Sequence, residues 1–206
     1  MDTRTQTRSK TLWMVQTAIL SAILIVLAFT PLGYLKYGTI SITFMTLPVV
    51  VGAIIVGPGC GALLGAVFGI TSLVQCFGLD AFGTMLMSIN PFYTVVMCLV
   101  PRILMGWLVG LIFRALSKID RTRIASFAVA SVSGALLNTV LFVGALVLFF
   151  GKSDDLRQFG DTVWKILGVL ITINAAIEAG VVLVVGTAIT KALGVTMGRR
   201  KGGTPV

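Results

Sequence analysis

The chain has 206 residues, of which 57% are hydrophobic and 11% are charged, and its mean hydropathy is +1.03. This apolar content exceeds what a soluble domain of this length can bury, so the composition indicates an integral membrane protein. The net charge of +9 does not indicate nucleic-acid binding, because the Lys and Arg residues lie at the ends of apolar segments. The chain has no His, and its three Cys residues are scattered, so we expect neither a metal site nor a cofactor.

Six apolar segments predict six membrane helices. The expected helices are residues 11–30, 42–56 with an interruption at Pro48, 59–77, 91–116 with Pro101 inside, 124–150 and 163–193. The predicted connections are 31–42, an exposed loop over 78–89, a charged loop over 117–123 and a polar loop over 151–162. We therefore predict an all-α six-transmembrane-helix bundle over residues 12–193, with a short re-entrant or lid-like first loop. Tails at 1–11 and 194–206 flank it.

An even number of spans puts both termini on one side of the membrane, and the basic residues indicate which side. Eleven Lys and Arg residues fall on the side of the termini: Arg4, Arg8, Lys10, Arg114, Lys118, Arg121, Arg123, Lys191, Arg199, Arg200 and Lys201. Four fall on the other side: Lys36, Lys152, Arg157 and Lys165. The positive-inside rule then predicts that both termini are cytoplasmic.

Small residues recur every fourth position in two of the predicted helices. In the third helix they are Gly57, Gly61, Gly65 and Gly69, and in the first helix Ala18 and Ala22 repeat the pattern. Such a stripe lets another helix approach closely, which is how membrane helices gain packing energy. We interpret the glycine stripe as a packing face. For both stripes, the alternative is a docking face for another membrane subunit.

Four polar side chains are expected within the membrane, where such groups are costly and functional by default. They are Arg102, Asn138, Asn174 and Glu178. Measured from the outer helix ends at about 1.5 Å per residue, all four lie roughly 15–20 Å deep. Pro101 predicts a kink beside Arg102. Either Arg102 and Glu178 pair and lock the bundle, or the four groups converge on a small polar ligand.

Several segments in order resemble the substrate-binding S components of energy-coupling factor (ECF) vitamin transporters. The resemblance covers about residues 12–193, and it rests on Ala18-Ile19-Leu20-Ser21-Ala22, on residues 28–34, on residues 47–58 and on the glycine-rich third helix. It implies that the first loop lids a vitamin site built by helices four to six. It also implies that the small-residue faces, with Ala18, Ala22, Gly57, Gly61 and Gly65, dock a transmembrane coupling subunit, which works with two ATPase subunits.

Three stretches resemble the pantothenate branch of this family: residues 101–104, residues 137–141, and Ile173-Asn174 with Glu178-Ala179. That branch reads Asn-Gly-Ile-Pro-Glu at the last stretch, whereas Ala175-Ala176-Ile177 follows Asn174 here. A folate, riboflavin or queuosine-precursor S component therefore stays an alternative.

If the ligand is pantothenate, we expect Arg102 to pair with its carboxylate and Asn138 and Asn174 to bond its amide and hydroxyls. Glu178 would accept from a hydroxyl or hold Arg102. Asn90, Tyr34 and Tyr37 would seal the mouth of the site. The family resemblance implies a non-catalytic subunit in a prokaryotic plasma membrane. The rival classes are an autonomous proton-coupled transporter using Glu178, a structural subunit and, with least support, a membrane enzyme.

Overall fold

The computed structural model describes residues 3–30, 34–37, 40–118 and 124–150, together with the isolated positions 180 and 184. Its elements are α1 (Thr3–Ala28), β1 (Tyr34–Tyr37), β2 (Ile40–Thr43), α2 (Thr46–Ile55), α3 (Pro58–Gln75), α4 (Ala81–Ile89), α5 (Pro91–Leu116) and α6 (Ile124–Phe150). Four of these helices contain a stretch that is long and apolar enough to cross a membrane: Lys10–Ala28, Pro58–Gln75, Pro91–Leu116 and Ala125–Phe150. The chain is an all-α membrane protein to which one small β-hairpin is added.

The predicted helices over 91–116 and 124–150 are confirmed, and the predicted helix over 59–77 is α3. The start of α5 follows from Asn90-Pro91. The Asn90 side chain accepts a hydrogen bond from the Tyr93 N–H at 3.2 Å, and Pro91 occupies the first turn, where its missing N–H costs nothing. Of the helix predicted over 163–193, the structure describes only positions 180 and 184, both of which are helical.

Three predicted segments are corrected by the structure, the first being the N-terminal tail over 1–11, because α1 begins at Thr3. The stretch 78–89, expected to be a loop, contains α4, whose first turn is capped because the Asp80 carboxylate accepts from the Gly83 N–H at 2.8 Å. The second helix begins at Thr46 rather than at residue 42, because residues 40–43 form β2. Pro48 is therefore in the first turn of α2, where it interrupts no helical hydrogen bond.

The glycine stripe of α3 packs directly on the backbone of α5. A Cβ atom added at Gly61 would collide with the Gly106 carbonyl oxygen, and one at Gly65 would collide with that of Arg102. At Gly69 the added atom would lie 2.8 Å from the Cys98 carbonyl oxygen. These contacts confirm the interpretation of the stripe as a packing face.

Because α5 covers Gly61 and Gly65, this face has no room for a second subunit, and their expected docking role is corrected to internal packing. Gly57 has a different role. It adopts φ +125° at the turn between α2 and α3, where an added Cβ would lie 2.9 Å from Arg114 Nη2.

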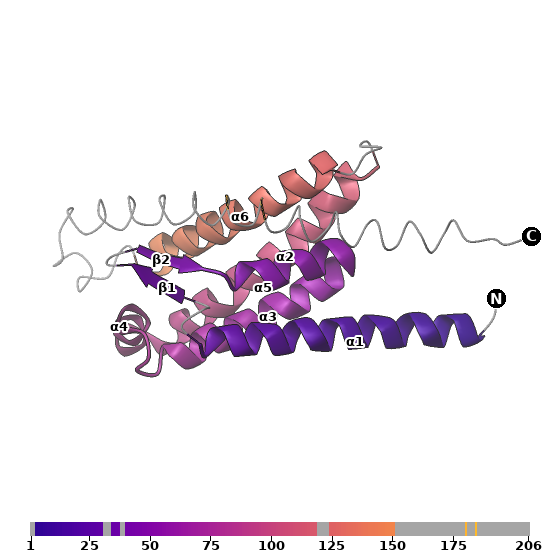
Figure 1. Ribbon diagram of the computed structural model, residues 1–206. Helices are drawn as coiled ribbons and strands as arrows, with labels where there is room; N and C mark the ends of the chain where they lie inside the picture. The colour runs from indigo at the N-terminus through magenta and orange to yellow at the C-terminus, as the bar shows by residue number, and fades with distance from the viewer. Residues whose placement is uncertain are drawn as a thin grey trace, which may run out of the picture.

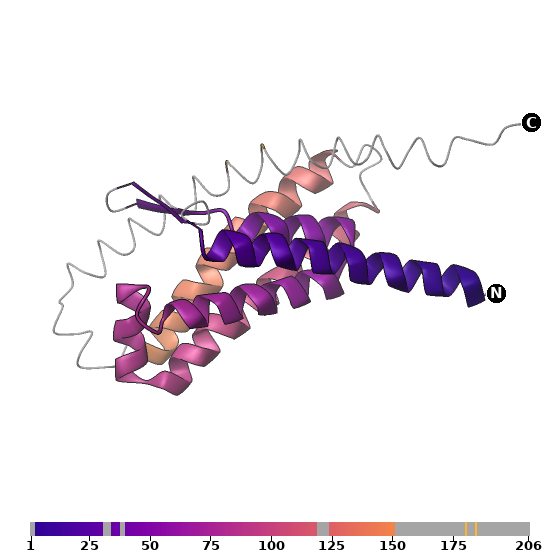
Figure 2. The same ribbon diagram turned by 60° about the horizontal axis from the view of Figure 1, so that its bottom comes forward.

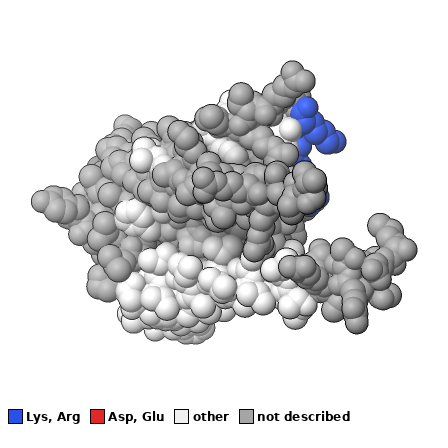
Figure 3. Space-filling model, turned by 45° about the vertical axis from the view of Figure 1, so that its right-hand side comes forward, with Lys and Arg blue, Asp and Glu red and all other residues white. Residues whose placement is uncertain are grey.

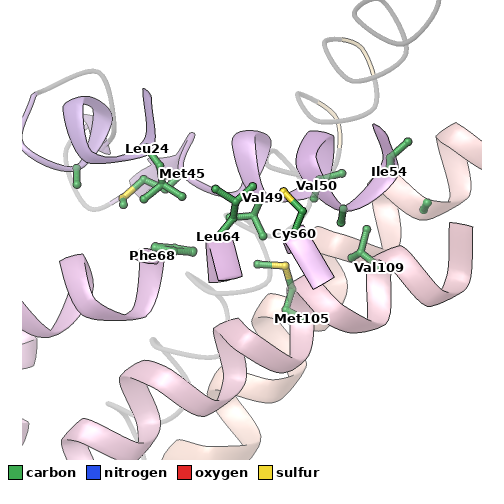
Figure 4. Packing of buried hydrophobic residues seen from close by; sticks show 13 residues of the cluster. Leu24, Met45, Val49, Val50, Ile54, Cys60, Leu64, Phe68, Met105 and Val109 are labelled. Carbon is green, nitrogen blue, oxygen red and sulfur yellow. The ribbon is translucent and has the colours of Figure 1, made fainter. Parts of the chain in front are cut away.

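The main core lies where α1, α2, α3 and α5 meet (Figure 4). Its fully buried side chains include Leu24, Met45, Val49, Val50, Cys60, Leu64, Phe68, Met105 and Val109. Helix α3 is central, with half of its membrane stretch buried, whereas only 17% of the corresponding stretch of α1 is buried. The outer side of α1 is consequently a broad exposed apolar surface, as expected for a helix that faces lipid or a membrane partner.

The β1–β2 hairpin and α4 lie at the same end of the bundle (Figures 1 and 2). The strands are antiparallel, and Tyr34 pairs with Thr43 and Tyr37 with Ile40. Helix α1 ends near this hairpin, and its start lies at the opposite end of the bundle (Figure 1). In Figure 3 the Lys and Arg side chains that are visible lie at the upper right edge, and the described surface along the lower part of the view carries no charged side chain.

Candidate functional site

Arg102 is the half-buried cation at the centre of the candidate site, and Pro101 determines how its side chain is held. Pro101 has no N–H, so the carbonyl of Met97, four residues earlier in α5, lacks its helical partner. Arg102 Nη1 donates to this carbonyl oxygen at 2.9 Å. The proline therefore creates the acceptor that fixes the guanidinium against its own helix.

Two aromatic rings flank the guanidinium of Arg102. Its Cζ lies 5.3 Å from the ring centroid of Phe68 on α3 and 5.1 Å from that of Phe142 on α6. Both separations fall within the range of cation–π attraction, which is strongest where water is excluded. Helices α3, α5 and α6 thus meet around one positive charge.

The Nε atom of Arg102 is buried, and it has no hydrogen-bond partner among the described residues. Asn138 lies one helical turn before Phe142 on α6, and its buried Oδ1 atom likewise has no partner in the described part of the chain. A buried polar atom with no partner carries a free-energy cost that a bound ligand relieves. Arg102 and Asn138 are therefore linked through Phe142, and each has one buried polar atom without a partner among the described residues; their convergence on a ligand stays a prediction.

The other predicted site residues have different outcomes. Asn174 and Glu178 lie outside the described residues, so the pairing of Arg102 with Glu178 stays a prediction. Asn90 is the N-cap of α5, and its side-chain oxygen accepts the hydrogen bond from the Tyr93 N–H. Tyr34 and Tyr37 are the first and last residues of β1 in the hairpin.

Sequence reasoning missed the aromatic residues of this region. Phe68 and Phe142 flank the guanidinium, and nearer the α4 end the ring of Tyr93 stacks on that of Phe149 with centroids 5.1 Å apart. The sequence does not mark these rings as site residues, because the chain has twelve Phe residues and most of them lie in apolar segments. Only the crossing of α3, α5 and α6 distinguishes these rings from ordinary core residues.

The first loop is anchored close to this region. Gln75 Nε2 at the end of α3 donates to the Ala28 carbonyl oxygen at 2.9 Å, and the last carbonyls of a helix have no partner within it. On the other side of the hairpin, Met45 is fully buried in the cluster that also contains Ala28 and Phe68. Ala28 before the hairpin and Met45 after it therefore belong to the same buried cluster as Phe68, whose ring contacts Arg102.

The small residues Ala18 and Ala22 of α1 are exposed, among large exposed side chains that include Ile19, Ile23 and Val26. Unlike Gly61 and Gly65, these two positions are open to a partner, so docking there stays a prediction.

The chemistry of the site suits a small ligand that carries an anionic group and hydrogen-bonding groups. Arg102 supplies a fixed positive charge in apolar surroundings, and Asn138 supplies an amide. Within the described ranges no group of three or more His, Cys, Asp or Glu side chains is arranged to hold a metal ion.

Comparison with known proteins assigns the chain to a family. Residues 13–190 match the family model described as "ECF transporter, substrate-specific component". The chain is 30% identical over 165 residues to the pantothenic acid transporter PanT of Lactococcus lactis subsp. cremoris, covering 73% of this chain and 76% of that protein. It is 29% identical over 149 residues to the pantothenate transporter PanT of Leuconostoc mesenteroides, covering 69% and 71% respectively. This chain therefore belongs to the family of substrate-specific (S) components of ECF transporters.

Proposed function

We propose that this chain is the membrane-embedded S subunit that captures pantothenate from outside the cell and delivers it inward together with a coupling subunit and two ATPase subunits. The family assignment and the names of the two relatives support the substrate class. The single observation that carries the proposal is the half-buried, aromatic-flanked guanidinium of Arg102, whose buried Nε has no partner among the described residues. Pantothenate has a carboxylate, an amide and hydroxyls, which match a cation beside asparagine side chains.

The proposed roles follow from the chemistry of each group. Arg102 binds the carboxylate, Asn138 and Asn174 bond the amide and hydroxyl groups, and Glu178 accepts from a hydroxyl or balances Arg102. The hairpin with Tyr34 and Tyr37 covers the site. Asn90, at the start of α5, completes the rim of the site. The chain itself catalyses no reaction, and ATP is hydrolysed by the partner subunits.

We place the chain in a prokaryotic plasma membrane with both termini in the cytoplasm. The described basic residues Lys10, Arg114 and Lys118 then lie on the cytoplasmic side, and Asp80 and the hairpin lie outside. The exposed α1 face with Ala18 and Ala22 docks the coupling subunit. In this arrangement the vitamin enters from the hairpin end of the bundle and reaches the site roughly 15–20 Å below the outer helix ends.

The experiment is transport in proteoliposomes that contain this chain together with a coupling subunit and two ATPase subunits. We expect pantothenate uptake that requires ATP and all the subunits. Arg102→Gln should abolish uptake, whereas the matched control Arg114→Gln, which removes an exposed cation at the other end of α5, should retain it. Uptake by the chain alone, driven by a proton gradient, would instead support an autonomous transporter. Unchanged uptake by Arg102→Gln would contradict the carboxylate role.

A further inference from the structure

Ser72 lies on the face of α3 that is turned toward Arg102. Phe68, Ser72 and Cys76 follow one another at intervals of four residues and so share one face, and Cys98 and Arg102 do the same on α5. The two faces meet at both ends of this stretch. The Phe68 ring lies 5.3 Å from Arg102 Cζ, and Cys76 Sγ lies 3.8 Å from Cys98 Sγ. Ser72 is one helical turn from each of these contacts.

The hydroxyl of Ser72 is buried and has no hydrogen-bond partner in the described part of the chain. The residue is 7% exposed, and its Oγ atom makes no hydrogen bond to any described residue. A helical serine ordinarily bonds a carbonyl three or four residues earlier, but Thr71 Oγ1 already donates to the Phe68 carbonyl oxygen at 2.9 Å. By contrast, Ser133 Oγ on α6 donates to the Ala130 carbonyl oxygen at 2.8 Å.

The second serine with an unpartnered buried hydroxyl among the described residues is Ser131. Ser131 precedes Asn138 on α6 by two helical turns, which is about 10 Å along the helix axis, whereas Phe142 follows Asn138. Ser72 differs from it because the helical face of Ser72 also carries Phe68, which contacts Arg102.

We propose that Ser72 is a further ligand-contacting residue, whose hydroxyl donates to the same anionic group that Arg102 Nε binds. This inference rests on the proposed function and extends it to a helix that was not expected to contribute to the site. A carboxylate has two oxygens, so it accepts from a guanidinium N–H and from a hydroxyl at once. One bound carboxylate would therefore satisfy both the Arg102 Nε and the Ser72 hydroxyl.

The competing explanation is that Ser72 is only a small residue at the α3–α5 crossing. In that case Ser72→Ala preserves the packing and leaves ligand binding unchanged. The two explanations differ in the response to the charge of the ligand. Panthenol, in which a hydroxymethyl group replaces the carboxylate of pantothenate, therefore serves as a second probe.

The test is a calorimetric titration of the purified full chain with pantothenate and with panthenol. For Ser72→Ala we expect a loss of about tenfold or more in pantothenate affinity, the size of a hydrogen bond to a charged group. Its panthenol affinity should change much less. The control Ser133→Ala should bind both compounds as the unmodified chain does.

Thermal unfolding of the unliganded variants gives an independent readout. Ser72→Ala should unfold at the same temperature as the unmodified chain or higher, because it removes a buried group with no partner. Pantothenate binding by Ser72→Ala within twofold of the unmodified chain would overturn the proposal. An equal loss for pantothenate and panthenol would overturn it as well. An unmodified chain that binds neither compound would refute the proposed function, and this inference with it.

Discussion

The substitution Gly65→Ala tests the contact between α3 and α5 that supports the candidate site. An added Cβ at this position collides with the Arg102 carbonyl oxygen and lies 3.0 Å from the Ile103 Cα atom. Both obstacles are backbone atoms, so the collision is relieved only by separating the two helices at the level of Arg102. Overpacking of this kind costs about 1–3 kcal/mol.

For a chain of this length, each kcal/mol of destabilisation lowers the midpoint of thermal unfolding by about 2–4 °C. The matched control is Gly144→Ala on α6, since an added Cβ there meets nothing within 4 Å. We expect the control to be neutral or slightly stabilising, because alanine favours the helix by about 1 kcal/mol over glycine.

The assay for both variants is thermal unfolding in detergent, followed by titration with pantothenate. Gly65→Ala should lower the unfolding midpoint by several degrees and weaken binding, because Arg102 shifts with its helix. Equal midpoints and equal affinities for Gly65→Ala and Gly144→Ala would refute the account of the α3–α5 crossing.

Three further predictions concern the loop anchor, the α5 cap and the docking face. Gln75→Leu removes the hydrogen bond to the Ala28 carbonyl and should speed pantothenate release in stopped-flow measurements; an unchanged release rate would contradict the anchoring role. Asn90→Ala removes the cap at Tyr93 and should cost about 1 kcal/mol in thermal unfolding, whereas Asn90→Asp should cost little; equal effects of the two substitutions would exclude capping as the cause. Ala18→Leu fills the exposed small-residue face of α1, so it should reduce copurification of the coupling subunit while pantothenate affinity stays unchanged. Normal copurification would show that the coupling subunit docks on another face.

The spanning helices were predictable because their signals are local. Apolar length defines α5 and α6, and Asn90-Pro91 identifies the start of α5. Helix α4 was missed because it is only nine residues long and contains Gly83, which obscured the capping signal of Asp80. The hairpin was read as a connection, although two runs rich in Tyr, Ile and Thr are separated by only two residues there.

The candidate polar residues Arg102 and Asn138 could be proposed from the sequence, but their contacts could not. The depths of Arg102 and Asn138 follow from counting along helices, so the sequence indicated a shared layer. The positions of Phe68 and Ser72 relative to Arg102 depend on how α3 crosses α5, which the glycine stripe indicated only as a packing face. The sequence predicted a kink at Pro101 beside Arg102, but the hydrogen bond from Arg102 to the Met97 carbonyl depends on the side-chain conformation.

The most direct measurement of the central claim is a calorimetric titration of the purified chain with pantothenate, alongside riboflavin, folate, a queuosine precursor and cobalamin. The account predicts tight, saturable binding of pantothenate to one site, weak or no binding of the others, and a large loss of pantothenate affinity in Arg102→Gln. Tight binding of a different vitamin, or no binding of pantothenate by well-folded protein, would contradict the account.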